Sequence, residues 1–309
     1  MFTSKEVKEY AKKHGADLVG ITSMDRFEGA PKEMDPRYIM PEAKAMVVLA
    51  FRILRGCLRG IEEGTNFISY SSMGYAGLNY VYIPMTLWNI CKFIEDKGYE
   101  AFPYLNPTHW VNIDHIIGGA RKEYSVPVSP DRPAPDVFVH FRIAAYAAGL
   151  GEIGWSKVFL TPEFGPRQRF AILLTDAPLE PDPIYNGPPL CDKCMLCAKG
   201  CSENAISRTE AIKIKVAGRN IEWGKLDGKK CLRGFSGNNL NLGATIEETA
   251  PSPYNPFLQK LKPIYQHGEA LEGARGCIRE CMIHLEEQGK IKSKFKESFR
   301  RRKPWKIIW

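Results

Sequence analysis

The stretch Cys191-Asp-Lys-Cys194-Met-Leu-Cys197-Ala-Lys-Gly-Cys201 holds four cysteines with two, two and three residues between them. This spacing is typical of a loop in which three thiols bind three irons of one 4Fe–4S cluster, while the fourth points away and binds a second cluster. A zinc site favours two separated Cys-x-x-Cys or Cys/His pairs and has no place for a third cysteine two residues on. Thiols this close in sequence rarely reach the geometry of a disulfide. The stretch therefore predicts an iron–sulfur site.

The other cysteines extend this prediction. Cys231, Cys277 and Cys281 follow the stretch, whereas the first 190 residues hold only Cys57 and Cys91. Cys57 and Cys91 lie in apolar surroundings, and we expect them to be small buried side chains rather than ligands. Two 4Fe–4S clusters with only protein ligands need eight of them, and the C-terminal part supplies seven thiols. The sequence thus predicts two clusters, one of which is a cysteine short.

Composition sets the class of protein. The 309 residues, 44% hydrophobic and 25% charged, are typical of a globular protein and suffice for two domains. Residues 1–8 are charged and lack the apolar stretch of an export signal. No apolar run approaches the ~20 residues of a membrane span. Seven ligand-type cysteines without such a signal favour a reducing cytoplasm, in an organism that lives with little oxygen.

The positive charge is concentrated at the C-terminal end. Residues 290–309 hold nine Lys or Arg and one acid, Glu297, so their balance of +8 equals the net charge of the whole chain. Such a basic tail could bind RNA or an anionic membrane surface, or dock an acidic electron donor. The simpler alternative is a solvated tail whose Trp305 and Trp309 pack on the body of the protein. Both interpretations stay open at this point.

Patterning indicates a mixed α+β architecture. The capping box Thr3-Ser-Lys-Glu6 begins a helix that reaches about residue 14, and the continuous apolar run 45–51 predicts a buried strand. Further strands are expected at 15–22, 99–104, 157–160 and 169–174, and helices at 80–97 and 138–148. Alternating elements up to about residue 180 favour an α/β sandwich. The five prolines of residues 178–189 predict a boundary before the cysteines.

One motif resembles a dinucleotide fingerprint. Gly149-Leu150-Gly151-Glu-Ile-Gly154 fits GxGxxG, but that fingerprint must follow a strand and begin a helix, whose N-terminus holds the pyrophosphate. Here a helix is expected before the glycines and a strand after them. We therefore expect no NAD binding by this loop. It is better explained as a helix stop, or as a tight turn where the backbone approaches something large and flat.

Several motifs together resemble the cobalamin-dependent reductive dehalogenase and epoxyqueuosine reductase superfamily. The motifs, in chain order, are Arg142-Ile-Ala-Ala-Tyr-Ala-Ala-Gly-Leu-Gly-Glu-Ile-Gly154, Phe159-Leu-Thr-Pro-Glu-Phe-Gly-Pro-Arg167, Leu174-Thr-Asp-Ala-Pro-Leu179 and the cysteine run. A weaker likeness covers residues 15–20, 40–44 and 98–103. The resemblance implies a nitroreductase-like α/β sandwich (1–185) that holds base-off cobalamin. A ferredoxin-like domain with two clusters (186–289) and the basic tail (290–309) would follow it.

The resemblance also implies how the thiols divide. Cys191, Cys194, Cys197 and Cys281 would hold one cluster, nearer the corrinoid or its partner, and Cys201, Cys231 and Cys277 would belong to the other. The family's second motif is Cys-x-x-Cys-x-x-x-Cys-Pro. In this chain Ala274 replaces its first thiol, Met282 replaces its proline, and Ser202 replaces the proline usual after the first motif. The second cluster would then be 3Fe–4S, or 4Fe–4S with His284, His267 or solvent as a ligand.

In this superfamily single electrons pass through the clusters to the corrinoid, and a proton donor acts above the corrin face. A Tyr near a cation, or a carboxyl group with a raised pKa, suits that role. By resemblance, the catalytic candidates are Tyr75 and Tyr80, from a stretch that also holds Tyr70 and Tyr82, together with Asp136, His140 and Arg142. The candidate corrinoid-binding residues are Gly149, Leu150, Gly151, Gly154, Pro166 and Arg167.

Two departures bear on the substrate. Only 28 residues follow Cys281, counted from 309 − 281, where epoxyqueuosine reductases continue into a tRNA-binding segment, and the twin-arginine leader of respiratory dehalogenases is lacking. We therefore expect a cytoplasmic corrinoid-dependent reductase of a small organic molecule, as a monomer or homodimer, supplied by a low-potential donor such as ferredoxin or flavodoxin. The alternatives are an iron–sulfur protein that reduces a separate corrinoid protein and, less favoured, a tRNA-modifying enzyme.

Overall fold

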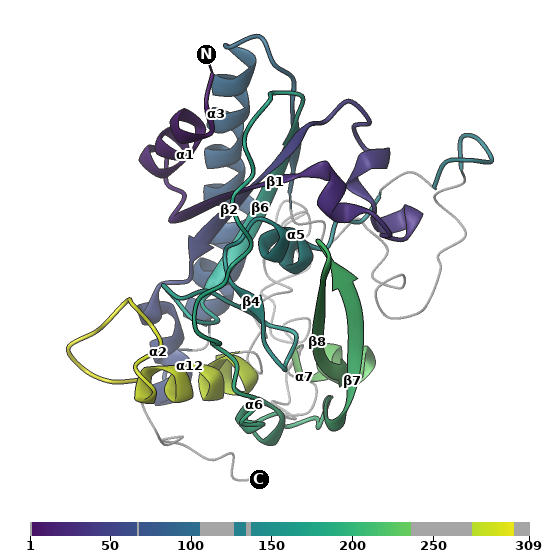
Figure 1. Cartoon of the computed structure of the whole chain (residues 1–309). Coiled ribbons are helices and arrows are strands. Elements are labelled where there is room, and N and C mark those ends of the chain that lie inside the picture. Colours follow the sequence, from purple (N-terminus) through teal and green to yellow (C-terminus); the bar gives the residue numbers. More distant parts are fainter. Residues whose placement is uncertain (1, 67, 106–126, 134–136, 236–273, 300–309) are drawn as a thin grey trace, which may run out of the picture.

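A four-stranded antiparallel sheet forms the centre of the N-terminal half (Figure 1). The structure is a computed structural model and describes residues 2–66, 68–105, 127–133, 137–235 and 274–299. The strands lie in the order β1-β2-β6-β3 and comprise β1 (Leu18–Ser23), β2 (Ala45–Arg52), β3 (Ala101–Tyr104) and β6 (Gln168–Thr175). All residues of β2 except Arg52 are buried, as expected for a continuous apolar run between two layers. The strands predicted at 15–22, 45–51, 99–104 and 169–174 are confirmed.

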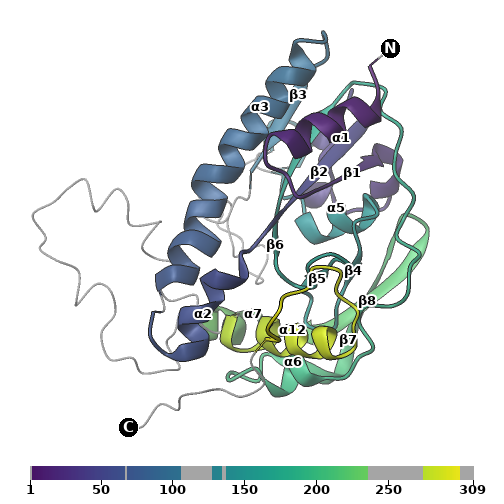
Figure 2. The ribbon, with the colours of Figure 1, turned by 90° about the vertical axis from the view of Figure 1, so that its left-hand side faces the viewer.

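Helices cover both faces of this sheet (Figure 2). On one face α1 (Ser4–Lys13) and α3 (Ile83–Glu95) pack over alternate strand residues such as Val47 and Leu49. On the other face α5 (Phe141–Ala147) packs over Met46, Val48 and their neighbours. The alternation of side chains along each strand therefore feeds two cores. The predicted sandwich of helices on a sheet is confirmed, as is the mixed α+β class.

Local signals explain the ends of several helices. The capping box of α1 is present, because Glu6 N donates to Thr3 Oγ1 at 3.3 Å and Thr3 N donates to Glu6 Oε2 at 2.9 Å. The helix predicted at 138–148 is shorter, since His140 is still extended before α5 begins. The helix predicted at 80–97 divides into the last residues of a π-helix, η4 (Tyr70–Tyr82), and α3. The sequence did not predict η4, nor α2 (Arg55–Glu63) before it.

Short elements complete this half: the 3-10 turns η1 (Met24–Phe27), η2 (Lys32–Met34) and η3 (Pro36–Tyr38), and the two-residue strands β4 (Glu152–Ile153) and β5 (Phe159–Leu160). The strand predicted at 157–160 is thus only two residues long, because Lys157 has a left-handed φ of 64°. Cys57 and Cys91 are buried, as predicted. No helix among the described residues is long and apolar enough to cross a membrane.

The glycine turn between α5 and β4 has the order predicted, helix first and strand second. Gly149 ends α5 with φ 73°, and a Cβ there would lie 2.1 Å from the carbonyl oxygen of Pro183. Gly151 has φ 153°, and a Cβ there would lie 2.0 Å from the carbonyl oxygen of Leu160. Only glycine fits such close approaches of backbone to backbone. The turn is therefore a helix stop packed on the chain's own backbone, without the context of a dinucleotide fingerprint.

The cysteines lie on a second group of elements. These are α6 (Leu196–Lys199), the antiparallel hairpin of β7 (Ile206–Val216) and β8 (Arg219–Leu226), α7 (Gly228–Phe235) and α12 (Cys277–Glu287). Helix α12 packs on α6, and its Met282 and Ile283 share an apolar group with α2, which lies beside it in Figure 1. Val216 and Trp223 of the hairpin join the core under α5. The two halves of the chain are thus in contact, and the division at residue 185 stays a prediction.

The first half of the basic tail lies on the body of the protein. Ile291 and Phe299 are each 5% exposed, and Phe299 N donates to Glu286 Oε2 at 2.7 Å. Residues 300–309, with Trp305 and Trp309, lie outside the described residues.

Candidate iron–sulfur centre and active site

The first thiol set comprises Cys191, Cys194, Cys197 and Cys281. All four line one small cavity, although Cys281 comes from α12 and the others from the loop that leads into α6. Left-handed φ values of 57° at Lys193 and 61° at Met195 curl this loop around the cavity. The backbone N–H of Trp155 donates to Cys191 Sγ at 3.3 Å. This set therefore comes together as the sequence and the resemblance predicted.

The electrostatics of the first set favour a bound cation. Burial, together with the neighbouring thiols, raises the pKa of Cys197 to about 11 and that of Cys281 well above the usual value for a thiol. Thiolates this close repel one another unless a metal neutralises them. Four soft sulfur ligands with an N–H donor to one of them are the donor set of an iron–sulfur cluster. The residues of the first set thus fit a 4Fe–4S cluster.

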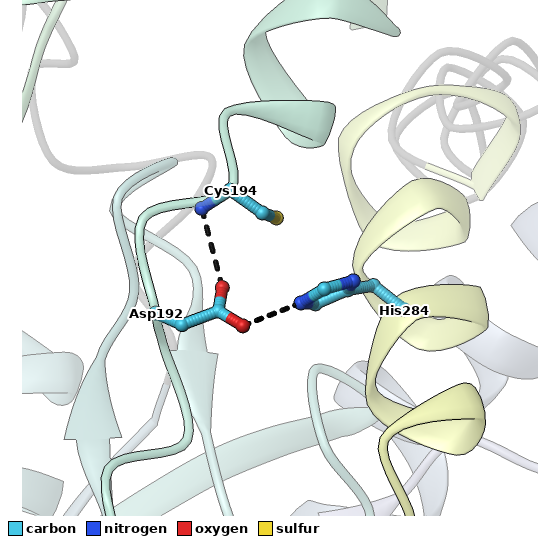
Figure 3. Close-up of side chains that lie close together, drawn as sticks. All are labelled: Asp192, Cys194 and His284. Carbon is cyan, nitrogen blue, oxygen red and sulfur yellow. Dashed lines mark hydrogen bonds and ion pairs between the residues drawn. The ribbon is translucent and has the colours of Figure 1, made fainter.

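His284 lies with the first set (Figure 3). Its Nε2 is 2.7 Å from Asp192 Oδ2, while Asp192 Oδ1 accepts from Cys194 N at 3.2 Å. Ligand atoms of Asp192, Cys194 and His284 lie within 4.8 Å of one another. Burial raises the pKa of Asp192, but the hydrogen bond and charge of His284 outweigh this and lower it. The structure thus places His284 with the first thiol set, and its suggested role as a ligand of the second cluster stays a prediction. His267 lies outside the described residues.

The second thiol set comprises Cys201, Cys231 and Cys277. Cys201 Sγ accepts from Ala205 N at 3.4 Å, Cys277 is the first residue of α12, and Cys231 is exposed on α7. Cys201 and Cys277 pack against the same apolar group as Cys197. This second set thus adjoins the first, and α12 contributes one thiol to each.

A group of cations and tyrosines lies beside the second set. Burial lowers the pKa of Arg142, and the nearby charge of Arg169 lowers it further. Cys231, Cys277 and Tyr75 are near enough to oppose this shift. The Arg169 guanidinium lies 4.0 Å from the centre of the Tyr75 ring, and its Nη2 donates to Tyr70 Oη at 3.1 Å. The candidates Arg142 and Tyr75 therefore lie in one cluster, which we call the Arg–Tyr cluster (Arg142, Arg169, Tyr70 and Tyr75).

Burial also shifts the pKa values of groups in and beside the Arg–Tyr cluster. Burial raises the pKa of Tyr70, against the lowering effect of Arg169. Burial lowers the pKa of His140 to about 3, and the charges of Lys157 and Arg142 add to this. Burial likewise lowers the pKa of Lys157 to about 8, helped by Arg142. Tyr70, beside Arg169, and His140, beside Arg142, are thus both uncharged at pH 7.

Several buried polar atoms here have no hydrogen-bond partner among the described residues. They are His140 Nδ1, Arg169 Nε, and both the amide oxygen and nitrogen of Asn79 on η4. Buried polar atoms are almost always paired, so orphaned ones favour a ligand or water that completes them. This observation fits a polar molecule bound beside the Arg–Tyr cluster.

The remaining catalytic and corrinoid-binding candidates lie at different places in the fold. Tyr80 is half-buried on η4, and Asp136 lies outside the described residues. Leu150 packs on the core under α5, and a Cβ on Gly154 would meet Leu160 at 3.1 Å.

Pro166 is buried, and Arg167 is 2% exposed, with its Nη1 donating to the carbonyl of Ile53 at 2.7 Å. Arg167 and the glycines thus contact the chain itself, and their corrinoid-binding role stays a prediction.

Comparison with known proteins shows which family the chain is related to. No protein-family model matches the chain. Tetrachloroethene reductive dehalogenase of Sulfurospirillum multivorans is 26% identical over 267 residues, which cover 73% of this chain and 45% of that protein. The chain is a distant homologue of the reductive dehalogenases.

Solved dehalogenases share its fold. Catabolic reductive dehalogenase NpRdhA, in complex with 3-bromo-4-hydroxybenzoic acid, superposes with a TM-score of 0.52 and 19% identity over 93% of this chain and 37% of that one. Epoxyqueuosine reductase from Streptococcus thermophilus superposes with a TM-score of 0.48 and 16% identity over 92% of this chain and 81% of that one. The homologous tetrachloroethene reductive dehalogenase is an oxidoreductase. The chain spans less than half the length of the dehalogenases, 45% and 37%.

Sequence reasoning missed two cations that lie near Arg142, namely Arg169 and Lys157. Arg169 lies on β6, where the apolar run predicted a strand, and a charged residue inside such a run was the available signal. Lys157 sits in a left-handed turn that only the fold reveals.

Proposed function

We propose that this protein is a reductive dehalogenase-like reductase that passes single electrons through two iron–sulfur clusters to a corrinoid, which reduces a small organic substrate. The observation that supports this most is the convergence on α12. One helix contributes Cys281 to the first thiol set and Cys277 to the second, and the second set adjoins the Arg–Tyr cluster. Electrons would enter at the first set, whose Cys194 is exposed, and leave from the second.

The Arg–Tyr cluster would supply the proton. Reduction of a carbon–halogen or similar bond requires a proton as well as electrons, and a corrinoid in its most reduced state would supply the electrons. We assign the proton to the hydroxyl of Tyr75, whose ring lies on the Arg169 guanidinium. Arg169 would stabilise the phenolate left after the transfer, because it places a fixed positive charge beside the tyrosine. Tyr70 would orient Arg169 through its hydrogen bond.

The substrate would be a small organic molecule, and an anionic one suits the site best. Arg142, Arg169 and Lys157 place three cationic side chains around it. A related dehalogenase has been solved with a brominated hydroxybenzoic acid, which carries a carboxylate. Halogenated phenolic acids are therefore the first compounds to assay, with chlorinated ethenes as the uncharged comparison.

Metal analysis of protein purified under nitrogen tests the proposal. About eight irons per chain with about one cobalt, and a corrinoid visible spectrum, would support it. Iron without cobalt, even after incubation with cobalamin, would overturn it. That result would leave the protein an electron-transfer partner of a separate corrinoid protein. Salt-sensitive binding of tRNA by the intact chain would instead favour the RNA-modifying alternative.

A further inference from the structure

The second thiol set has three cysteines where a 4Fe–4S cluster needs four ligands. The inference below rests on the proposed function, because it concerns a ligand of one of the two clusters. His284 lies with the first set, beside Asp192 and Cys194. Because Asp192 holds His284 on the side of the first set, we look to another side chain for the fourth ligand of the second set.

Helix α12 presents one face to both thiol sets. Four residues of α12 lie along one face of the helix, because successive members are three, one and three residues apart. They are Cys277, Glu280, Cys281 and His284. Arg279, Met282 and Ile283 are buried and point the other way, toward α2. Cys281 and His284 both line the cavity of the first set. By the same spacing, Cys277 of the second set has Glu280 as its neighbour one turn on.

Glu280 lies against the chain beside Cys201. A Cβ on Gly200 would come within 2.5 Å of Glu280 Cγ and 3.4 Å of its Cδ. Gly200 directly precedes Cys201, so the absence of a side chain there makes room for the glutamate. The Glu280 side chain therefore packs against Gly200, the residue before Cys201, and lies one helical turn along α12 from Cys277.

The carboxylate of Glu280 is held in place. Its Oε1 accepts from Arg279 Nη1 at 2.9 Å, and Arg279 is fixed in turn by Glu62, whose Oε1 and Oε2 accept from Nε at 2.8 and 3.0 Å. The side chain of Glu280 is only 23% exposed. The bond to Arg279 involves Oε1 and leaves Oε2 able to bind iron, for which carboxylates are established ligands.

Ala274 stands where the family's second motif has its first cysteine, and in this chain it packs in an apolar core. Ala274 is 1% exposed and belongs to the apolar group of Tyr70, Ile61 and Met282. An alanine packed in this way has no ligand atom to offer and helps to keep water away. The ligand lost there would be replaced six residues further on.

We infer that the carboxylate of Glu280 is the fourth protein ligand of the second cluster and completes it as 4Fe–4S. No electron or group transfer is involved, only a bond from a carboxylate oxygen to the iron that lacks a cysteine.

Spectroscopy of the full chain tests this, after anaerobic purification and before any assay of activity. An oxidised 3Fe–4S cluster is paramagnetic, whereas an oxidised 4Fe–4S cluster gives no such signal, so electron paramagnetic resonance distinguishes the two. We expect wild-type protein to hold about eight irons and to lack the 3Fe–4S signal. Glu280→Ala and the isosteric Glu280→Gln, which keeps the shape of the side chain, should each lose about one iron and gain about one such spin per chain.

Two further variants sharpen the test. Glu280→Cys supplies a thiolate at the same place and should restore the 4Fe–4S form. Glu287→Gln, an exposed acid two turns on along α12, should behave like the wild type. The inference is overturned if wild-type protein carries the 3Fe–4S signal, if Glu280→Gln matches the wild type, or if Glu280→Cys matches Glu280→Gln. The first set should keep its four irons in every variant, and a chain that binds no iron at all would overturn the proposed function as well.

Discussion

The two thiol sets share helix α12 but have opposite surroundings. The first set has four cysteines, reaches the surface at Cys194 and lies beside the Asp192–His284 pair. The second has three cysteines, of which Cys231 is also exposed, and lies beside the partly buried Arg142 and Arg169. A cluster beside an acid and a histidine near the surface suits electron entry. A cluster beside cations is reduced more easily, so it suits the acceptance of electrons from the first set.

The two thiol sets differ in the residues that surround them and not in the motifs that supply their cysteines. The run 191–201 contributes thiols to both sets, as does α12. What differs is the neighbour that the fold brings to each thiol from far away in the sequence, such as Arg142 near Cys277. Each prediction below changes the thiols, the neighbours of one set, or the helix that both sets share.

Loss of one thiol from α12 should have the largest effect. Cys281→Ser should remove the first cluster and Cys277→Ser the second, each with a loss of about half of the iron and of all turnover, because serine is a poor ligand of iron–sulfur clusters. Iron analysis and the spectra of the reduced protein would show which cluster remains. Loss of the same signal in both variants would show that the thiols are divided differently.

Removal of the Tyr75 hydroxyl should abolish proton delivery without disturbing either cluster. Tyr75→Phe keeps the ring on Arg169, and we expect turnover to fall by about 10²–10⁴-fold, the usual contribution of a general acid. Single-turnover rates with a halogenated phenolic acid would measure this. Tyr82→Phe, on the same helix but exposed, is the matched control. Unchanged turnover in Tyr75→Phe would exclude this hydroxyl as the proton donor.

The sequence predicted the parts of the molecule that depend on neighbouring residues. Local patterns account for the apolar run of β2, the capping box of α1, the order of helix and strand around Gly151, and the three thiols Cys191, Cys194 and Cys197. Contacts between distant residues could not be predicted in this way. Arg169 and Tyr70 are 99 residues apart in sequence, so no periodicity links them.

The same limit applies at α12. Its pairing with α2 depends on the whole fold, and neither α2 nor the π-helix η4 had a recognisable start signal. Leu54 and Ser69, the residues before these helices, make no side-chain capping hydrogen bond. The division of seven thiols into two sets came from a family resemblance, and the helix that joins the sets came from the structure.

We expect the buried Glu62–Arg279 pair to stabilise the fold around helix α12, which carries one thiol of each set. Its side chains are 4% and 2% exposed, and removal of one partner leaves an uncompensated buried charge, which destabilises a protein by about 3–5 kcal/mol. We expect Arg279→Met and Glu62→Gln each to lower the free energy of unfolding by that amount, measured by denaturant titration. The double variant Glu62→Leu/Arg279→Met should recover most of it. Single variants within about 1 kcal/mol of the wild type would contradict a structural role for the pair.

We expect His140 to make the stability of the folded protein decrease in acid. Its pKa is lowered to about 3, mainly by burial, from 6.5. Between these values the unfolded chain binds a proton that the folded chain does not, so stability is complete above pH 6.5 and falls as the pH is lowered toward 3. At pH 5 the loss from this group should reach about 2 kcal/mol.

Calorimetric unfolding between pH 5 and 7 measures the effect. His140→Gln should flatten the dependence, whereas His14→Gln, near the end of α1, should leave it unchanged. An identical slope in wild-type and His140→Gln protein would show that other groups cause the acid sensitivity.

The smallest effect should come from the acid beside the first set. Asp192→Asn removes a negative charge that lies next to Cys194 and pairs with His284 and Lys290, at 2.7 and 3.7 Å. Because reduction adds an electron, loss of this charge should raise the midpoint potential of the first cluster by about 1 kcal/mol, or some tens of millivolts, and leave the second unchanged. Potentiometric titration of both clusters would measure the shifts, with Asp131→Asn, exposed and in a turn, as the control. An equal shift of both potentials would mean that the two sets share one electrostatic environment, and the contrast between a set beside an acid and a set beside cations would then be lost.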